Sequence, residues 1–578
     1  MKRSIKHIYV GIISLLCIGG MSACGESRTP DAPKLNTQTE RLSAPENLYL
    51  EIHHYAQRTK YILTWNEDSR ADGYTVEIDG VTLNTEEAKC ELTRYFYDET
   101  KQTVKVTAVG TGNYESSAAS EIECVAEDPT NRIDYQKSGE GYAVYSNSLD
   151  LSGRLVIPDY YADKKIVAVQ DYAFGGETGT SAIRSAYFTS VRFPRGLKKI
   201  GEYAFDSCEY LKSVVIPDGV TECGLWAFNG CVRLKSATLS ASMTEISSAL
   251  FWGCEQLAEC VFPENLTKIQ AGAFSSTAFE EIRFPNTLAY IGDQAFSSCN
   301  NLKTVELSST VELDENVFAA CKSLENIFVE EGNPKYKSID GNLYTSDGTT
   351  LLQYAAGKTA ERFALPSGVT HIGVQAFAYA VCLKELEIPE GVLSIGEYAF
   401  AYCDGLTVLE LPSTIEFVGV SAFSSAKNLE TVILPNTVKS IWSGAFSQSK
   451  IKYLEIPEGV EKIEKNAFGG LGQKIDYIVI PKSMTDMQSA FPASDAGFIE
   501  SIFNSLTLGS IYYKGTAEEW EQIAGSEYFD EKDTTVYYYS ESEPPLSEDG
   551  TAYDGNYWYY DENGVPMVWT KEENGAQE

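Results

Sequence analysis

The stretch Ile395-Gly-Glu-Tyr-Ala-Phe400-Ala-Tyr-Cys403-Asp-Gly-Leu406-Thr-Val-Leu409-Glu-Leu411-Pro412-Ser-Thr-Ile415 contains the unit that decides the fold. Its frame, Ile-Gly-x-x-Ala-Phe-x-x-Cys-x-x-Leu-x-x-Val-x-Ile-Pro-x-x-Val, recurs along most of the chain. Successive copies lie 22 or 23 residues apart, except for intervals of 31 and 59. Such regular spacing is typical of a solenoid, in which each unit stacks on the next. The phenylalanine of the frame stands at Phe174, Phe205, Phe228, Phe251, Phe274, Phe296, Phe318, Phe377, Phe400, Phe423, Phe446, Phe468 and Phe491.

Each unit contains a short strand and a tight turn. Leu409 and Leu411 are two residues apart, so they share one face of a strand. Pro412 ends that strand because it has no N–H to donate to a neighbour. Phe400 and Cys403 are spaced as in a single helical turn. One unit cannot bury these apolar side chains alone, but stacked units can bury them as a continuous core.

This frame resembles the leucine-rich repeat of the BspA-like bacterial surface proteins, and the resemblance extends over residues 133–540. It rests on the pattern Ile-Gly-Glu-Tyr-Ala-Phe, Cys, Leu and Leu-Pro, which recurs about a dozen times. The resemblance implies a right-handed solenoid with a parallel sheet, export to the cell surface and adhesion to host proteins. The expected fold class is mainly β with short helical turns, a leucine-rich-repeat solenoid preceded by a β-sandwich.

The beginning of the chain reads as an export signal. Residues 1–23 contain three basic residues and an apolar run from Ile8 to Ile18, which is too short for an ordinary spanning helix. Met21-Ser-Ala-Cys24 resembles the lipobox of bacterial lipoproteins, which implies lipid attachment at Cys24. Ordinary cleavage beside an incidental cysteine is the alternative. With a lipid anchor the protein would face the exterior of a bacterial cell envelope, and residues 24–44, which are polar, would form a tether.

Residues 45–126 follow a different pattern. Tyr61-Ile-Leu-Thr-Trp65, Gly73–Ile78 and Val104–Val109 alternate with period two, and turn signals lie between them. Short strands in such a segment suit a sandwich. The spacing resembles a fibronectin type III domain with Trp65 and Tyr74 in its core, although valine replaces the usual tyrosine near residues 104–106. A spacer that lifts the solenoid from the membrane is the expected role, and independent ligand binding is the alternative.

Several segments depart from the repeat. Residues 133–170 are expected to cap the start of the solenoid, because a terminal coil lacks a neighbour on one side. Two Asp-Gly turn signals between 332 and 348 predict a hairpin inserted into a continuing stack. Thr516 and Glu519 form a capping box that predicts a short helix carrying Trp520. Residues 541–578 are expected to form an acidic linker and an aromatic terminal hairpin around Asn563-Gly564, and cell-wall-binding repeats offer a more distant comparison.

Charge and residue types narrow the function. The formal charge is −36, and removal of the three basic residues of the signal makes it −39, so nucleic acid is not an expected partner and membrane contact is expected only through the lipid anchor. Only His53, His54 and His371 remain after the signal. No pattern resembles a nucleophile elbow, a zincin or a phosphate loop. We therefore expect no enzymatic activity, no catalytic residues, no metal site and no cofactor.

The cysteines mostly belong to the repeat. Of the 13 in the chain, Cys208, Cys231, Cys254, Cys299, Cys321 and Cys403 share one position, where cysteine serves as a small buried apolar residue. The thiols of Cys208, Cys231 and Cys254, which lie on successive turns, are expected to be free and slow to react. Cys90 and Cys124 could form a bridge within the sandwich, and the sequence leaves this open.

The expected binding surface is the outward face of the repeat strands. In each Leu-x-x-Val-x-Ile strand the Val and Ile positions face inward, so the residue before each of them faces outward. The leading hypothesis is a surface-anchored recognition or adhesion protein that binds a host or neighbouring-cell protein or glycan. The alternatives are a glycan-capturing lipoprotein of a nutrient-uptake system and a passive structural stalk. The candidate ligand-binding residues are Phe328, Glu385, Glu387, Glu410, Tyr453, Glu455 and Tyr477.

Overall fold

The computed structural model is nearly all β-structure and forms two compact units. The first unit contains the described residues up to 49 together with 64–90 and 102–123, and the second contains 50–63, 91–101 and the chain from 124 onward. Cys24, Phe468 and Phe491 lie outside the described residues. The structure describes residues 40–571 except for 57, 97–100, 126, 131, 149, 176, 179–181, 184, 465, 466, 468–473, 488–506, 525 and 527–533.

The first unit is built around an antiparallel sheet in the order β5-β4-β7-β9. Val76 of β4 lies opposite Val106 of β7, and both are buried. Trp65 and Tyr74 pack edge to face with their ring centroids 5.2 Å apart. The alternation predicted for this segment therefore places its apolar side chains inside. The strands of this unit are β1 (Glu40–Arg41), β4 (Gly73–Ile78), β5 (Val81–Thr85), β7 (Lys101–Val109), β8 (Tyr114–Glu115) and β9 (Ser120–Val125).

The second unit begins with a sheet that the sequence did not indicate. Strands from residues 49–64 continue the sheet of the solenoid's first coils, because β2 pairs in parallel with β13 through His53 and Tyr160. The buried Asp159 carboxylate accepts hydrogen bonds from the Ile52 N–H and from Arg192, both at 2.9 Å. The single sandwich over 45–126 stays a prediction. The elements of this sheet are β2 (Tyr49–Tyr55), β3 (Arg58–Thr64), β6 (Lys89–Glu91), β10 (Asp134–Ser138), β11 (Gly141–Tyr145), β13 (Tyr160–Tyr161) and β14 (Lys164–Val169), followed by β18 (Lys199–Ile200) and β20 (Glu222–Cys223) of the solenoid.

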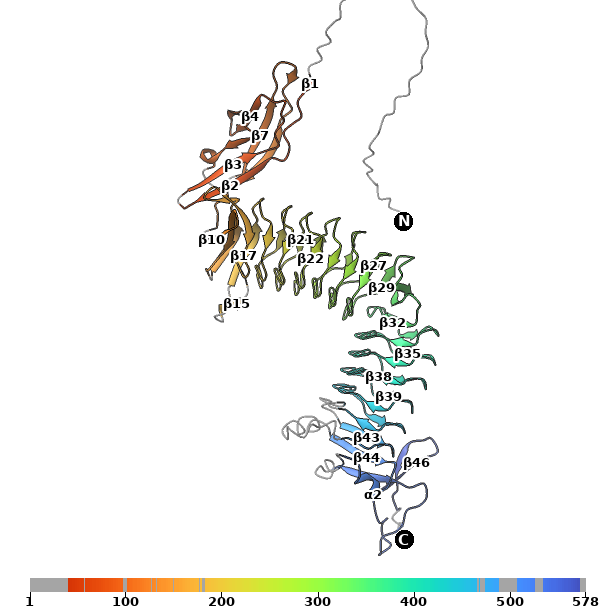
Figure 1. The fold of residues 1–578 in the computed structure, drawn as a ribbon. Helices are drawn as coiled ribbons and strands as arrows, with labels where there is room; N and C mark the ends of the chain where they lie inside the picture. Colours follow the sequence, from red (N-terminus) through yellow and green to blue (C-terminus); the bar gives the residue numbers. More distant parts are fainter. Residues whose placement is uncertain are drawn as a thin grey trace, which may run out of the picture. The chain divides into compact units, whose positions relative to one another are not determined.

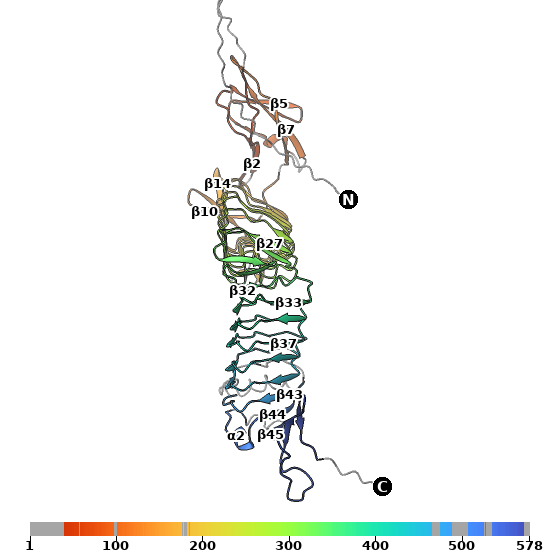
Figure 2. The same ribbon diagram turned by 90° about the vertical axis from the view of Figure 1, so that its right-hand side faces the viewer.

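The rest of the second unit is a solenoid whose coils each contribute one strand to a front sheet, as the stacked arrows of Figures 1 and 2 show. Successive front strands pair in parallel, for example Leu409 with Val432. The front strands are β12 (Asp150–Val156), β17 (Ser185–Arg192), β19 (Ser213–Val215), β21 (Ser236–Thr238), β23 (Glu259–Val261), β25 (Glu281–Ile282), β27 (Thr304–Leu307), β29 (Asn326–Val329), β33 (Arg362–Ala364), β35 (Glu385–Glu387), β37 (Val408–Glu410), β39 (Thr431–Ile433), β41 (Tyr453–Glu455), β43 (Lys474–Ile480), β44 (Thr507–Tyr513) and β45 (Thr535–Tyr539).

Shorter strands, most of which end at the isoleucine position of the Ile-Gly pair of the frame, form a back sheet. They also pair in parallel from coil to coil, for example Ile372 with Ile395. The predicted mainly-β solenoid with a parallel sheet is therefore confirmed. The back strands that follow β14 are β18 (Lys199–Ile200), β20 (Glu222–Cys223), β22 (Glu245–Ile246), β24 (Lys268–Ile269), β26 (Tyr290–Ile291), β28 (Glu312–Leu313), β32 (Thr350–Gln353), β34 (His371–Ile372), β36 (Ser394–Ile395), β38 (Phe417–Val418), β40 (Ser440–Ile441) and β42 (Lys462–Ile463).

The core between the two sheets is a ladder of phenylalanine rings. Phe400 is fully buried and stacks on Phe377 and Phe423, with ring centroids 5.1 and 5.5 Å away. The repeat cysteines are buried beside this ladder, as predicted. The Cys403 thiol donates to the Phe377 carbonyl of the preceding coil at 2.9 Å, and burial raises the pKa of Cys403 to about 12. The other five cysteines at this repeat position also donate to a phenylalanine carbonyl, so each of the six satisfies a backbone acceptor.

The corner that carries the phenylalanine is a tight turn. The Cys403 N–H donates to the Phe400 carbonyl, which is the bond expected of one helical turn. Tyr398 and Tyr402 flank this turn in the left-handed region, with φ of +52° and +59°. A Cβ at Gly396 would lie 2.6 Å from a backbone carbon of the preceding coil, so glycine is required at this close approach of two coils. The left-handed residues follow from coil closure and were not predicted.

Two predicted departures from the repeat are confirmed within the second unit. The insertion forms an antiparallel hairpin, β30 (Tyr336–Ile339) with β31 (Asn342–Thr345), around Asp340-Gly341. The helix α2 (Ala517–Trp520) carries the predicted capping box, and Trp520 is buried in the core. The described residues also include the short pair β15 (Glu177–Thr178) and β16 (Ala182–Ile183) and the 3-10 helix η1 (Thr93–Tyr95). No helix among the described residues is both long and apolar enough to span a membrane.

The end of the chain forms a hairpin that joins the front sheet. β46 (Tyr557–Tyr560) pairs in parallel with β45 and antiparallel with β47 (Pro566–Val568), and the connecting turn contains Asn563-Gly564. Figure 1 shows β46 close to β43 and β44. The predicted aromatic hairpin is thus confirmed as a packed element of the second unit.

Candidate functional site

The front sheet presents its outward residues as the strand pattern predicts. Leu409 and Val432 point into the core, whereas their neighbours Val408, Glu410 and Ile433 are exposed. Two outward positions of the last coils, Val479 and its register partner Tyr512, depart from this pattern, which the repeat alone did not indicate. Val479 of β43 is fully buried although its position in the repeat faces outward.

Three of the predicted glutamates come together in one groove on this sheet. Glu385, Glu387 and Glu410 border an open groove of about 640 Å³ across β33, β35, β37 and β39. Arg362 on the neighbouring strand donates to Glu385 at 2.8 Å. We call this feature the open groove. It is lined by Arg362, Phe363, Ala364, Glu385, Leu386, Glu387, Ile388, Glu390, Glu410, Leu411, Pro412, Ser413, Ile433, Leu434 and Pro435.

Two of these carboxylates have no counter-charge within the described part of the chain. Among the residues that the structure describes, no side chain or backbone group hydrogen-bonds or pairs with the carboxylate of Glu387 or Glu410. Many other carboxylates of the solenoid meet a basic side chain of an adjacent coil. Examples of such pairs are Lys199 with Glu222, Lys303 with Glu280, Lys335 with Glu312, Lys384 with Glu361 and Lys452 with Glu430.

Phe328 lies in a separate groove of the same sheet. This second groove, of about 510 Å³, is bordered by Arg283 and Glu306 as well as by Phe328, whose side chain is 48% exposed. Phe328 and the three glutamates are therefore not part of one site.

The remaining candidates lie further along the sheet, where the terminal hairpin covers it. Tyr453 and Tyr477 pack with their ring centroids 5.1 Å apart, and Tyr453 remains 41% exposed. Glu455 is not available in the same way, because Lys514 donates to it at 2.8 Å and the Tyr560 hydroxyl donates to it at 2.7 Å. The predicted glutamates Glu385, Glu387 and Glu410 therefore lie in the open groove, whereas Tyr453, Glu455 and Tyr477 lie in or beside the part of the sheet that the terminal hairpin covers. We call this second part, which also includes Val479 and Tyr512, the covered stretch.

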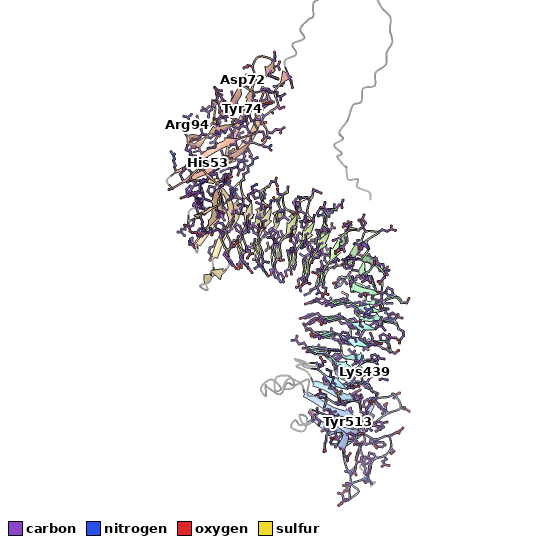
Figure 3. All side chains as sticks on the ribbon, viewed as in Figure 1. His53, Asp72, Tyr74, Arg94, Lys439 and Tyr513 are labelled. Carbon is purple, nitrogen blue, oxygen red and sulfur yellow. The ribbon has the colours of Figure 1, made fainter. Side chains whose placement is uncertain are left out.

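Trp558 is the centre of the cover. Its side chain is fully buried, and its ring centroid lies 5.3 Å from that of Tyr512 on β44. The indole N–H donates to the carbonyl of Tyr513 at 2.9 Å, in the last coils of the solenoid (Figure 3). Val479 belongs to the same cluster, which explains why this outward residue is buried. We call Trp558 and Tyr560 together the aromatic cover.

Burial and charge shift the tyrosines under the cover. Burial, the hydrogen bond to Glu455 and the charge of that carboxylate raise the pKa of Tyr560 above its ordinary value of 10.0. Burial and the same carboxylate also raise the pKa of Tyr477. Both phenols therefore keep their protons at neutral pH, and the Tyr560 hydroxyl acts as a hydrogen-bond donor to Glu455.

The sequence did not predict the contacts that the Tyr560 hydroxyl and the Lys514 ammonium make with Glu455, or the hydrogen bond of the Trp558 indole. Lys514 stands just outside a front strand, and Trp558 lies 79 positions after Val479. The run of aromatics from Tyr557 to Tyr560 was a signal of packing, but it did not indicate the partner. Among the described residues, no group of three or more His, Cys, Asp or Glu side chains is arranged to hold a metal ion.

Comparison with protein families gives one match. A family model described as a BspA type leucine rich repeat region matches residues 176–303, 246–350 and 356–495, and these ranges together cover more than half of the chain. No curated protein matches the chain.

Several solved structures are similar to the chain. A leucine rich cell surface protein from Faecalibacterium prausnitzii A2-165 shares 21% sequence identity, with a TM-score of 0.45 over 68% of this chain and 96% of that one. A leucine-rich repeat protein from Eubacterium ventriosum ATCC 27560 shares 19% identity, with a TM-score of 0.44 over 63% of this chain and 86% of that one. The pneumococcal vaccine antigen PcpA shares 22% identity, with a TM-score of 0.41 over 72% and 93%.

Proposed function

The chain belongs to the BspA-type leucine-rich repeat family, and from this premise we propose that it is a surface-anchored recognition protein. The partner is a protein of a host or of a neighbouring cell, bound on the front sheet of the solenoid. The proposal gives the chain no catalytic role and no cofactor. Export and lipid attachment at Cys24 would place the solenoid outside a bacterial cell.

One observation carries the proposal, namely the open groove. It combines exposed carboxylates with the apolar surface of Ile433 and Pro435 on a rigid sheet whose backbone is fixed by neighbouring coils. Grooves with mixed apolar and polar linings are common sites of recognition. Its volume of about 640 Å³ can accept several side chains of a partner.

A glycan-capturing lipoprotein is the second candidate. The observation that favours it is the pair of Tyr453 and Tyr477, whose rings lie 5.1 Å apart at the border of the aromatic cover. Sugar rings bind to exposed aromatic faces, and Tyr453 offers such a face because it is 41% exposed. A passive structural stalk is the third candidate, and it requires neither surface.

Two binding assays separate these functions. The full chain is used to capture host extracellular proteins and is applied in parallel to a glycan array. An identified protein partner should bind the triple variant Glu385→Gln, Glu387→Gln, Glu410→Gln more weakly than wild type and should bind Tyr453→Ala, Tyr477→Ala normally. A glycan ligand should show the opposite pattern. Full binding by both variants would exclude the front sheet, and the absence of any ligand would favour the stalk.

Lipid anchoring has its own test. In a bacterial host that processes lipoproteins, the wild-type chain should partition with membranes, whereas Cys24→Ala should leave the membrane fraction. Mass spectrometry of the N-terminal peptide should detect acyl chains only in the wild type. An unmodified wild-type Cys24 would contradict the anchor without affecting the binding proposal.

A further inference from the structure

Three glutamates of the front sheet occupy the same position of the repeat. Glu387 ends β35, Glu410 ends β37 and Glu455 ends β41, and each is the second outward residue of its strand. Because the strands run parallel and in step, these carboxylates project from the same side of the sheet. Because the three positions are equivalent, the groups that contact one glutamate indicate which groups the other two could bind.

At Glu455 the chain supplies its own partner. Lys514 donates an ammonium N–H to this carboxylate at 2.8 Å, and Tyr560 donates its hydroxyl at 2.7 Å. The Lys514 ammonium also lies 5.6 Å from the centre of the Tyr560 ring. At one such position, therefore, the structure shows a carboxylate that binds both an ammonium and an aromatic hydroxyl.

At Glu387 and Glu410 the corresponding places hold no donor among the described residues. These two carboxylates stand on adjacent coils, and like charges at neighbouring sheet positions repel each other. A cation placed between them would remove that repulsion. Arg362 does not serve this purpose, because it forms its ion pair with Glu385.

The rest of the open groove suits the stems of long basic side chains. Ile433 is 48% exposed, and Pro412 and Pro435 line the same groove. Lysine and arginine lay their methylene stems along apolar surface while the charged end reaches a carboxylate. The groove crosses four strands, which at a spacing of about 4.8 Å is a span of roughly 14 Å, or about four residues of extended chain.

We propose that the open groove docks an extended, lysine- or arginine-bearing segment of a partner protein. The basic groups of this segment bind Glu387 and Glu410 in the way that Lys514 binds Glu455. The inference rests on the proposed recognition function and names the chemistry of its partner. A second copy of this chain is a poor occupant, because two chains with a formal charge of −36 repel each other.

A short peptide tests this chemistry directly. The probe is a fluorescent, unstructured peptide of seven residues with lysine at alternate positions, and the matched probe carries acetyl-lysine in their place. The full chain is titrated against both probes while fluorescence anisotropy is recorded, at low and at physiological salt. The lysine probe should bind and the acetylated probe should not, and added salt should weaken binding by slowing association.

Matched variants locate the site. Glu387→Gln, Glu410→Gln should weaken binding roughly fivefold or more, since two exposed ion pairs are lost. Glu397→Gln, Glu416→Gln is the control, because it removes the same charge from exposed residues that do not line the groove. The control should remain within about twofold of wild type, because only screened long-range attraction is lost.

Several outcomes would overturn the inference. Equal losses in the two variants would show that only net charge attracts the peptide. Binding of the acetylated probe, or no binding of the lysine probe, would exclude ammonium recognition. A captured host partner that contacts the groove through neutral or acidic residues would also overturn it, while the proposed recognition function would stand.

Discussion

The open groove and the covered stretch are two parts of one sheet with opposite environments. Both are built from the same repeat, and both place the same positions outward. In the first, Glu387 and Glu410 border an open groove of about 640 Å³. In the second, Val479 is buried beneath a tryptophan from the chain's end. The repeat therefore fixes the direction of each side chain, while segments outside the repeat decide which outward residues a ligand can reach.

The outward residues themselves account for this difference. The covered stretch carries the large rings of Tyr477, Tyr512 and Tyr537. The terminal hairpin stabilises the fold by removing part of their apolar surface from water. The open groove carries carboxylates, which an apolar cover would desolvate at a cost. The terminal hairpin thus packs where its burial is most favourable.

The largest expected effect is the loss of the core beneath the open groove. Phe400→Ala removes a fully buried ring that stacks on Phe377 and Phe423, so it should cost about 3–5 kcal/mol of local stability. Hydrogen exchange should accelerate first in the coils of Phe377 and Phe423. The Cys403 thiol, whose pKa is raised to about 12 by burial, should also react faster with a thiol reagent.

Tyr402→Ala is the control for this experiment, because Tyr402 lies on the same coil and is 39% exposed. It should leave exchange near Phe400 unchanged. A uniform rise along the chain in Phe400→Ala would contradict the nearest-neighbour stability expected of a solenoid.

Removing the centre of the aromatic cover should have the next largest effect. Trp558→Ala should cost about 2–3 kcal/mol, less than an internal ring, because the terminal hairpin can detach rather than enclose a cavity. Exchange should rise at the amides of Val479, Tyr512 and Tyr513 and stay unchanged at Glu387 and Glu410. Met567→Ala, an exposed residue of the same hairpin, is the control. Protection that persists in Trp558→Ala would show that other contacts hold the cover.

The aromatic cover should also respond to alkaline pH. The pKa of Tyr560 is raised above 10.0 in the folded chain, so the folded state binds this proton more tightly than the unfolded state. Its contribution to stability is therefore complete below pH 10 and is lost progressively as the pH rises above that value. Near-UV circular dichroism and tyrosine absorbance should follow the loss. Tyr560→Phe should lack this transition, and an unchanged profile in that variant would refute the assignment.

The repeating part of the fold was predictable from sequence for a physical reason. The pattern from Ile395 to Ile415 is enough to predict which residues form the strand, the turn and the core. Stacked copies of the unit bury the core residues against each other, which predicts a solenoid. The insertion around Asp340-Gly341 and the capping box at Thr516 were likewise local signals. Each needed only neighbouring residues to be read.

What the sequence did not reveal depends on long-range contacts. Strand β2 joins the sheet of the first coils by pairing with Tyr160, more than 100 positions away, and the alternation of β2 names no partner. The availability of Glu455 depends on Tyr560 at a separation of 105. The candidate residues were therefore correct in direction, but the sequence could not separate the open groove from the covered stretch.

The smallest expected effect compares two glutamates at the same position of the repeat. Glu455→Gln should destabilise the chain by roughly 0.5–1 kcal/mol, because it weakens the pair between the half-exposed Glu455 and the mostly buried Lys514, and also the bond from Tyr560. Glu410→Gln should be neutral or should stabilise the chain by a few tenths of a kcal/mol, because it relieves repulsion with Glu387. Urea denaturation measures both. Lys514→Met should be coupled to the first substitution in a double-mutant cycle and not to the second, since that ammonium pairs with Glu455 and not with Glu410. Changes of opposite sign in the free energy of unfolding would show that glutamate at this repeat position stabilises the covered stretch and destabilises the open groove. Changes of equal sign would remove this energetic distinction.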